Sequence, residues 1–252
     1  MATREGEVLV EVREVWKSFD TKPVLRGLSL SLGKGTTLAV MGGSGSGKTV
    51  LLRICDGLLA PDDGEVYLFG TRIDNLREEQ ILPVRRQAGY VFQNAALFDS
   101  LSVFENVAFP LREHTRLSEG EITDRVHRFL ALVGLPGTDD LLPAELSGGM
   151  RKRVGIARTL VTEPEVVFFD EPTAGLDPTN SRLVAELIAE LRRGVADTAI
   201  VVTHDIEFAD MVADQMAILY QGRFVEMGTP AEIHRSANQV VRDFLAGELR
   251  EG

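Results

Sequence analysis

Several features that mark other protein classes are absent or scarce in this sequence. One cysteine, Cys55, occurs in 252 residues, so no disulfide can form within the chain. No apolar run approaches the roughly 18 residues that a membrane span needs. The first residues, MATREGEVLVEV, contain acids and no apolar core of a signal peptide. We therefore expect a cytosolic protein whose association with any membrane requires a partner.

Positive charge is also in short supply. Lys and Arg number 27 against 38 Asp and Glu, which gives a formal net charge of −11. Nucleic-acid binders usually present a basic face, and anionic lipid attracts basic proteins, so this balance disfavours both kinds of partner. Hydrophobic residues make up 44 %, which suits one large α/β domain or one domain with an inserted lobe.

Short apolar strands end in polar or glycine-rich residues at four places. These places are the glycine loop that begins at Gly42, and then Gln93, Asp170 and His204. In an open parallel α/β sheet, ligands bind at the edge where the carboxyl ends of the strands meet. We therefore expect the four places to form one site at that edge.

The segment GGSGSGKT fits G-x-x-x-x-G-K-[ST] and stands between a predicted strand and a predicted helix. Glycines allow backbone N–H groups to surround phosphate oxygens, and the helix N-terminus adds partial positive charge. Lys48 is placed to neutralise the β- and γ-phosphates, and Thr49 to ligate Mg²⁺. The predicted phosphate-binding residues are Gly42, Gly43, Ser44, Gly45, Ser46, Gly47, Lys48 and Thr49.

The polar residues at the other strand ends have separate expected roles. Asp170 follows a dry strand and can reach the metal through water, whereas Glu171 stands one step closer to solvent and can polarise an attacking water. The amide of Gln93 both donates and accepts, so it can touch metal and water. His204 can orient the γ-phosphate. Each of these residues, taken alone, also fits an ordinary surface or loop position.

A second glycine motif, ELSGGMRKR, opens another predicted helix. Ser147 can cap this helix, and Gly148 and Gly149 allow a phosphate to approach the backbone. The motif lies in a different lobe from the GGSGSGKT segment, the P-loop. We therefore expect it to face the γ-phosphate held by a second copy. Two copies arranged head to tail would then enclose two ATP molecules with twofold symmetry. Residues 151–153 are either a solvated helix face or an added positive field at the phosphate.

Helical periodicity sets the expected boundaries. Ile122, Val126, Phe129, Leu130 and Val133 mark one face of a helix, which indicates an inserted helical subdomain over 94–160. We expect one domain over 1–252. Residues 1–93 and 161–228 would form its sheet-bearing core, and 229–252 a C-terminal helix that begins at a capping box.

Together these residues resemble the ATP-binding cassette (ABC) ATPases over nearly the whole chain. The resemblance implies an α/β P-loop NTPase fold with a mostly parallel sheet, an N-terminal antiparallel β-subdomain and an inserted α-helical subdomain. It implies ATP hydrolysis coupled to transport, with Glu171, Gln93 and His204 as catalytic residues. It assigns the other motifs as Walker A at 42–49, the signature at 146–150, Walker B at 166–171, the D-loop at 174–177 and the adenine-stacking aromatic at Phe19. Val50, Met150 and Asp177 join the nucleotide-binding residues.

Within that family, the segments NVAFPLREHTRLSEGEI, LLPAELSGGMRKRVGIAR and VVRDFLAG resemble the ATPases of Mla/Mce-type lipid transporters. This resemblance implies phospholipid transport between inner and outer membranes. It implies a membrane permease docked beside Gln93, with Leu97 and Phe98 as candidate contacts, and a position on the cytoplasmic side of the inner membrane. It further suggests an Mce-domain protein and a STAS-domain protein as partners. Met150 stands where Gln is commoner in the signature.

Three alternatives remain open. The chain could serve an importer of another small solute. A soluble cassette ATPase acting on DNA or ribosomes is a second possibility, although the chain has neither a long coiled-coil interruption nor a second cassette. A small-molecule P-loop kinase is a third, but it would leave the SGG helix without a role.

Overall fold

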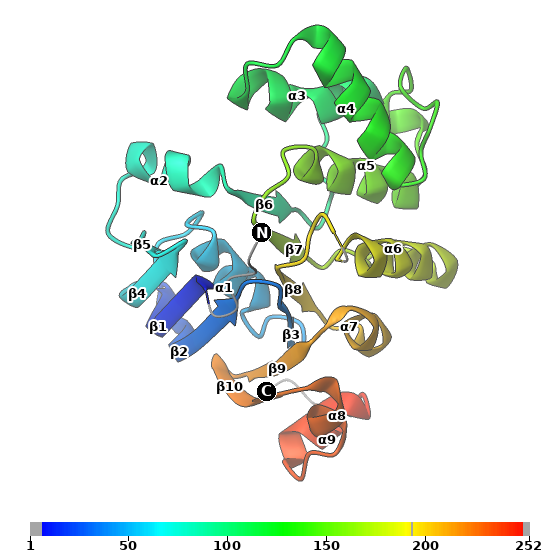
Figure 1. Cartoon of the computed structure of the whole chain (residues 1–252). Coiled ribbons are helices and arrows are strands. Elements are labelled where there is room, and N and C mark those ends of the chain that lie inside the picture. The colour runs from blue at the N-terminus through cyan, green and yellow to red at the C-terminus, as the bar shows by residue number, and fades with distance from the viewer. Residues whose placement is uncertain (1–6, 193, 249–252) are drawn as a thin grey trace.

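A mostly parallel sheet forms the centre of the computed structural model, which describes residues 7–192 and 194–248 (Figure 1). Its strand order is β10-β9-β3-β8-β7-β6, and β10 alone of these runs antiparallel to its neighbour. Every residue of β3, β7 and β8 is buried, as expected of apolar strands covered on both faces. The strands are β3 (Thr37–Met41), β6 (Ala88–Val91), β7 (Val166–Asp170), β8 (Ala199–Thr203), β9 (Gln215–Tyr220) and β10 (Arg223–Gly228).

A smaller antiparallel sheet covers one side of this centre, in the order β2-β1-β4-β5. Val10 and Val12 of its long strand β1 are buried, while Glu11 between them is partly exposed, as expected of side chains on opposite faces of a strand. These valines share one apolar cluster with Leu38 and Phe168 of the larger sheet. The strands are β1 (Val8–Phe19), β2 (Lys22–Gly33), β4 (Asp63–Leu68) and β5 (Thr71–Arg72).

Helices cover the remaining surfaces, and α3, α4 and α5 form a lobe at the top of Figure 1. The predicted stripe of α4 is buried, with Phe129 wholly enclosed, and the same apolar cluster continues into Phe169 of β7. The helices are α1 (Lys48–Cys55), α2 (Glu78–Arg85), α3 (Val103–His114), α4 (Glu119–Leu132), the 3₁₀ turn η1 (Pro143–Glu145), α5 (Gly148–Leu160), α6 (Pro178–Leu191), α7 (Ile206–Val212), α8 (Pro230–His234) and α9 (Gln239–Leu245).

The C-terminal segment differs from the prediction of one helix over 229–252. Within the described residues it forms two short helices, α8 and α9. Thr229 and Glu232 make the expected capping box at the start of α8. The chain then turns, and Asn238 accepts a hydrogen bond from the Val240 N–H and so starts a new helix. Asn at such a position favours a cap over continuation, which explains the break.

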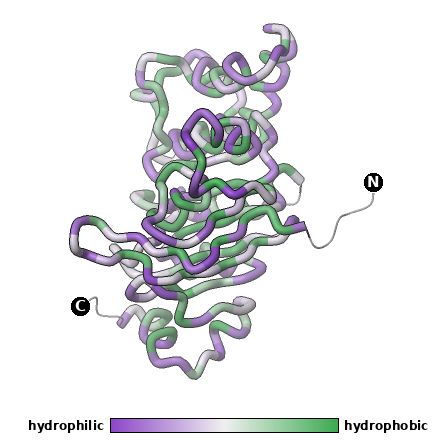
Figure 2. Tube along the Cα trace, turned by 90° about the vertical axis from the view of Figure 1, so that its left-hand side faces the viewer, coloured by the Kyte–Doolittle hydropathy of each residue, from purple (hydrophilic) through white to green (hydrophobic). Residues whose placement is uncertain are grey.

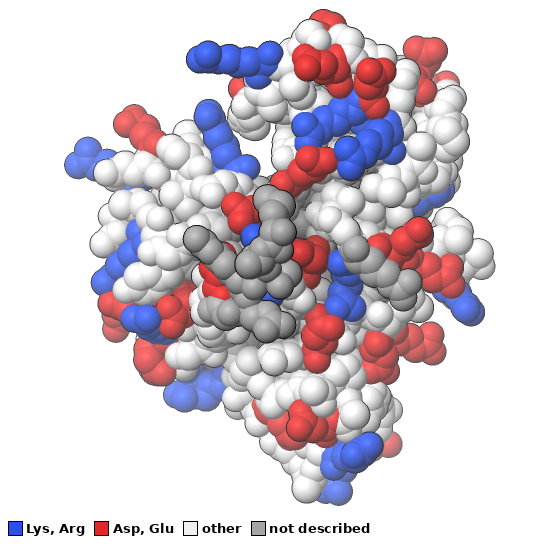
Figure 3. Space-filling view, in the orientation of Figure 1, with Lys and Arg blue, Asp and Glu red and all other residues white. Residues whose placement is uncertain are grey.

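Polarity follows this architecture. Figure 2 shows hydrophobic stretches of the trace along the central strands and hydrophilic ones toward the loops. Positive and negative side chains are interspersed over the face in Figure 3. Among residues 7–192 and 194–248, no helix is both long enough and apolar enough to cross a membrane.

Asp56 is a buried carboxyl at the C-terminal end of α1, the helix that follows the P-loop. Arg85 donates to the main-chain oxygens of Asp56 and Gly57. Within the described chain, Oδ1 of Asp56 has no hydrogen-bond partner. Burial raises the pKa of Asp56 to about 7, although the charge of Arg85 opposes the shift. A carboxylate is also unfavourable at a helix C-terminus.

Replacing Asp56 with Asn should therefore stabilise the protein increasingly as the pH rises. The pKa is higher in the folded than in the unfolded chain, so the wild type loses stability between about pH 4 and pH 7 and regains none above that. The advantage of D56N in the free energy of unfolding should grow by about 2 kcal/mol from pH 5.5 to pH 8.5, measured by urea denaturation. The exposed Asp124→Asn serves as control. A D56N advantage that is constant with pH would contradict this account.

Candidate functional site

The P-loop joins β3 to α1 and is shaped to receive an anion. Gly45 and Gly47 have φ of 75° and 104°, which L side chains rarely adopt. A Cβ at Gly42 would lie 2.3 Å from the carbonyl oxygen of Leu219, so this position has room only for glycine. No side chain caps the N-terminus of α1. Its first N–H groups and partial positive charge are thus available to a phosphate.

The buried side chain of Lys48 packs against this loop. Its Nζ donates to the carbonyl oxygens of Gly42 and Gly43 at 2.8 and 2.9 Å and lies 3.5 Å from Oε1 of Glu171. The side chain is only 7 % exposed. A buried ammonium held by carbonyl dipoles and one carboxylate remains a strong attractor for a further anion.

Asp170 ends β7 and receives two hydroxyl donors. Thr49 donates to Oδ1 at 2.7 Å, and Tyr90 donates to Oδ2 at 3.0 Å. Burial, and then the neighbouring carboxylate, raise the pKa of Tyr90 far above its usual range, so the phenol remains a donor.

Glu171 adjoins two basic groups. His204 Nδ1 lies 2.8 Å from Oε2, while Lys48 faces Oε1. The backbone of Glu171 has φ of 46°, a strained conformation for a residue with a side chain, and such strain is common at functional sites. Its peptide N–H bonds to the carbonyl of Val202 in β8 at 3.0 Å, which fixes the residue at the edge of the sheet.

A cleft of about 800 Å³ unites most of the predicted residues at this edge. Phe19 lies at its margin with 47 % of its surface exposed, which leaves the ring face available for stacking. Gln93 also lines the cleft and is exposed. The lining residues are Phe19, Val24, Gly43, Ser44, Gly45, Gly47, Lys48, Thr49, Val50, Gln93, Glu171 and His204.

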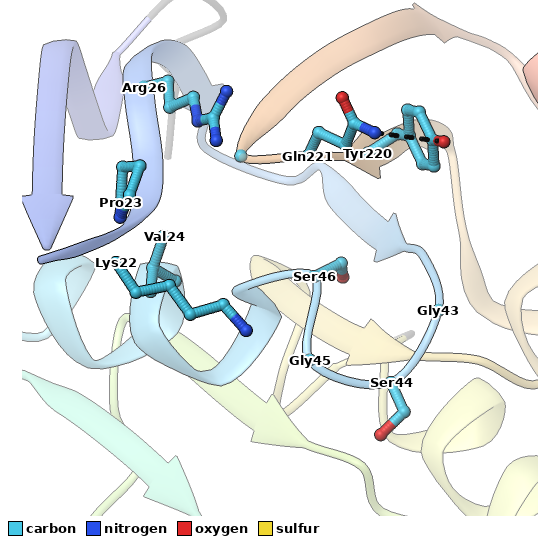
Figure 4. Close-up of a pocket in the computed structure, with 11 residues that line it drawn as sticks. Lys22, Pro23, Val24, Arg26, Gly43, Ser44, Gly45, Ser46, Tyr220 and Gln221 are labelled. Carbon is cyan, nitrogen blue, oxygen red and sulfur yellow. Dashed lines mark hydrogen bonds between the residues drawn. The ribbon is translucent and has the colours of Figure 1, made fainter. Parts of the chain in front are cut away.

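A second hollow, of about 420 Å³, adjoins the P-loop between β2 and the β9–β10 turn (Figure 4). Lys22 extends toward the loop, and Arg26 points toward Gln221. Within the described chain, neither Nε of Arg26 nor the buried Oγ of Ser46 has a hydrogen-bond partner. Lys22 and Arg26, which no sequence motif marks, add to the positive potential around the P-loop.

The predicted residues of the second glycine motif do not line this cleft. Ser147 is exposed and accepts from the Met150 N–H, so it caps α5 as expected. A Cβ at Gly149 would lie 2.6 Å from Oδ1 of Asn180, which places this glycine against α6. Asp177 caps α6 through the N–H groups of Thr179 and Asn180. Ser147 and Asp177 are thus exposed outside the cleft, whereas Gly149 is buried against α6.

The oxygen groups at the cleft fit a magnesium ion bound with nucleotide. Mg²⁺ usually takes one or two carboxylate or hydroxyl oxygens together with phosphates and water, not a dedicated protein cage. Thr49 and Asp170 supply such oxygens side by side. The described residues contain no group of three or more His, Cys, Asp or Glu that could hold a metal alone.

The sequence profile of the ABC transporter family matches residues 25–174. The chain belongs to the ABC transporter ATPase family. It is similar to the Arabidopsis thaliana protein TRIGALACTOSYLDIACYLGLYCEROL 3, with 44 % identity over 97 % of this chain and 75 % of that protein. The probable ribonucleotide transport ATP-binding protein mkl of Mycobacterium tuberculosis is 40 % identical over 95 % of this chain and 67 % of its own.

A third relative is the intermembrane phospholipid transport system ATP-binding protein MlaF of Escherichia coli. It is 38 % identical over 95 % of this chain and 89 % of its own length. Among solved structures, the ATP-binding cassette MJ0796, a dimer bound to ADP and phosphate, superposes with a TM-score of 0.82 at 30 % identity. The match covers 88 % of this chain and 99 % of that one. These findings confirm the predicted fold class of the ATPase.

Lys152 is a residue of the site whose position the sequence left open. It lies on α5 of the ATPase, yet only 7 % of it is exposed. Its Nζ donates to the main-chain oxygen of Gln93 and, at 3.3 Å, to that of Glu171. Burial lowers the pKa of Lys152, and the nearby carboxylates oppose the shift. Lys152 follows Gly149 by three positions, so both lie on the buried face of α5, and this helical spacing was the signal in the sequence that could have identified it.

Replacing Lys152 with Met should lower kcat at least tenfold while nucleotide affinity changes little. Met fills similar volume but leaves the carbonyls of Gln93 and Glu171 without their shared donor, so the catalytic main chain relaxes. Steady-state ATPase assays and equilibrium nucleotide binding separate the two effects. Lys34→Met removes an exposed lysine that pairs with Glu165 and serves as control. Equal kcat in K152M and wild type would rule out the role.

Proposed function

We propose that this chain is the ATP-hydrolysing subunit of a transporter that moves phospholipid between membranes, bound through a permease to the cytoplasmic side of the inner membrane. The observation that carries the proposal is the similarity to MlaF over 95 % of the chain, together with the nucleotide cleft. Lys48, Thr49 and Glu171 line the cleft around the phosphate loop, which suits a nucleotide. We assign the lipid path to the permease.

In the proposed ATP complex, Phe19 stacks on the adenine, Val50 borders the nucleotide, and the P-loop amides receive the phosphates. Thr49 and Gln93 would ligate Mg²⁺, and Asp170 would hold it through water. The metal would supply charge neutralisation between the phosphates. Support comes from the exposed ring of Phe19 and from the short Thr49–Asp170 contact.

Glu171 is proposed to orient and deprotonate the attacking water. Its carboxylate lies beside Lys48 and His204. The γ-phosphate competes for the same two basic groups, because both face the cleft. Phosphate binding would thus release Glu171 from Lys48 and leave it free to accept a proton. His204 then contacts the γ-phosphate.

Two copies are proposed to complete each site. The partner's Ser147, Gly148, Gly149 and Met150 would meet the γ-phosphate across a head-to-tail interface, with Asp177 of the D-loop beside it. Support comes from the exposed position of Ser147, outside the cleft of its own protomer, and from the dimeric state of MJ0796. The first-turn N–H groups of α5 that Ser147 does not cap would donate hydrogen bonds to the phosphate.

The permease is proposed to dock on the apolar surface after Gln93, which we define by Leu97, Phe98 and Phe109. Phe98 and Phe109 are 43 % and 40 % exposed, and their ring centroids lie 4.9 Å apart. Exposed aromatic pairs are typical of interface anchors. An Mce-domain protein and a STAS-domain protein are further proposed partners, on the resemblance to the Mla/Mce branch.

The substrate class can be tested with the complex of this ATPase and its co-purifying permease in proteoliposomes. We expect ATP-dependent transfer of fluorescent phospholipid, absent from the E171Q complex, which should bind ATP without turnover. The similarity to mkl makes ribonucleotide transport the second candidate. ATP-dependent uptake of radiolabelled ribonucleotide, with no lipid transfer, would favour that alternative.

Replacing Phe98 with Asp should reduce recovery of the permease at least tenfold while leaving nucleotide binding unchanged. A charge in the centre of an apolar contact is costly to desolvate. Co-purification from detergent-solubilised membranes measures the loss. The matched control is Met227→Asp, an equally exposed position (42 %) on β10, which lies at the opposite edge of the larger sheet from β6. Equal loss in both variants would contradict a specific surface.

A further inference from the structure

The Walker B carboxylate is held between two hydroxyls that come from different elements. Thr49 of α1 donates to Oδ1 of Asp170, and Tyr90 of β6 donates to Oδ2. Asp170 itself is 2 % exposed. A carboxylate with one donor can rotate about its last bond, whereas a donor on each oxygen fixes its plane.

The neighbours of Tyr90 determine where its hydroxyl lies. Tyr90 pairs in register with Phe168 of β7, two residues before Asp170, so both side chains point to the same face of the sheet. Its ring centroid lies 6.5 Å from that of Phe168 and 4.5 Å from that of Phe92. The phenol is therefore anchored by ring packing before it meets the carboxylate.

The two hydroxyls differ in what they can do next. Thr49 can give an oxygen lone pair to a metal while its hydroxyl continues to donate a hydrogen bond to Asp170. Tyr90 points its proton at the other oxygen of the same carboxylate and has no predicted contact with the metal. Its effect on a metal would pass through the orientation of Asp170.

We infer that Tyr90 is a positioning residue for Mg²⁺: its hydroxyl fixes the Asp170 carboxylate and thereby raises the affinity of the nucleotide site for the metal. The inference rests on the magnesium role proposed above. Groups behind the direct ligands commonly change metal affinity by roughly 10- to 100-fold when removed. The other interpretation of Tyr90 is a core aromatic, which needs the ring but not the hydroxyl.

Tyr90→Phe separates these interpretations because it removes one oxygen and keeps the ring packing. The matched control is Tyr67→Phe, in which another half-buried phenol loses its bond to a carboxylate, that of Glu65, in the smaller sheet. Both full-length variants are titrated with Mg²⁺ in the presence of a fluorescent non-hydrolysable ATP analogue. Mn²⁺ electron paramagnetic resonance then measures metal binding directly, and thermal melting monitors the fold.

For Y90F we expect the half-saturating Mg²⁺ concentration to rise roughly tenfold, with weaker Mn²⁺ binding and unchanged analogue affinity in EDTA. Y67F should match the wild type. A Y90F titration within twofold of wild type would overturn the inference and leave the proposed function intact, as would equal loss of affinity with and without metal. If wild-type binding of the analogue is itself independent of Mg²⁺, the proposed metal role fails and Tyr90 loses its assignment with it.

Discussion

The contact between α5 and the ends of β6 and β7 joins the helical lobe of this ATPase to its larger sheet. Lys152 donates to the carbonyls of Gln93 and Glu171, and Arg158 donates to those of Ala95 and Ala96. The space for this contact is narrow, because a Cβ at Gly155 would lie 3.0 Å from Ala95. The same helix begins at Ser147. A movement of the signature motif relative to the sheet therefore acts on the main chain that carries Gln93 and Glu171.

Much of the site could be predicted because it depends on short stretches of sequence. The P-loop chemistry lies within eight consecutive residues, and Asp170 and His204 each follow a buried strand, so the parallel sheet brings them to one edge. Lys152 and Tyr90 depend on packing between distant segments. The partner atom of Lys152 is 59 residues away and that of Tyr90 is 80 residues away. A basic run such as RKR does not reveal which of its members is buried.

Packing between distant segments also explains why the C-terminal segment forms two helices instead of the one predicted. A capping box marks where a helix begins but does not set its length, since tertiary contacts decide whether it continues. Here Ile233 of α8 and Val241 of α9 enter one cluster with Met216 of β9. Two short helices with a turn at Asn238 bring both apolar side chains to that cluster.

The basic groups of the cleft already have a carboxylate partner. Lys48, Glu171 and His204 form one connected group, and Lys48 and His204 are the groups that would hold a γ-phosphate. A triphosphate that displaces Glu171 from Lys48 brings more negative charge to an edge that already carries Asp170. In the proposed dimer, the N-terminus of the second copy's α5 would offset that charge, because the first-turn N–H groups that Ser147 does not cap remain donors. Closure of two copies and release of Glu171 would then favour each other, which couples ATP binding to motion of the lobe that bears Phe98.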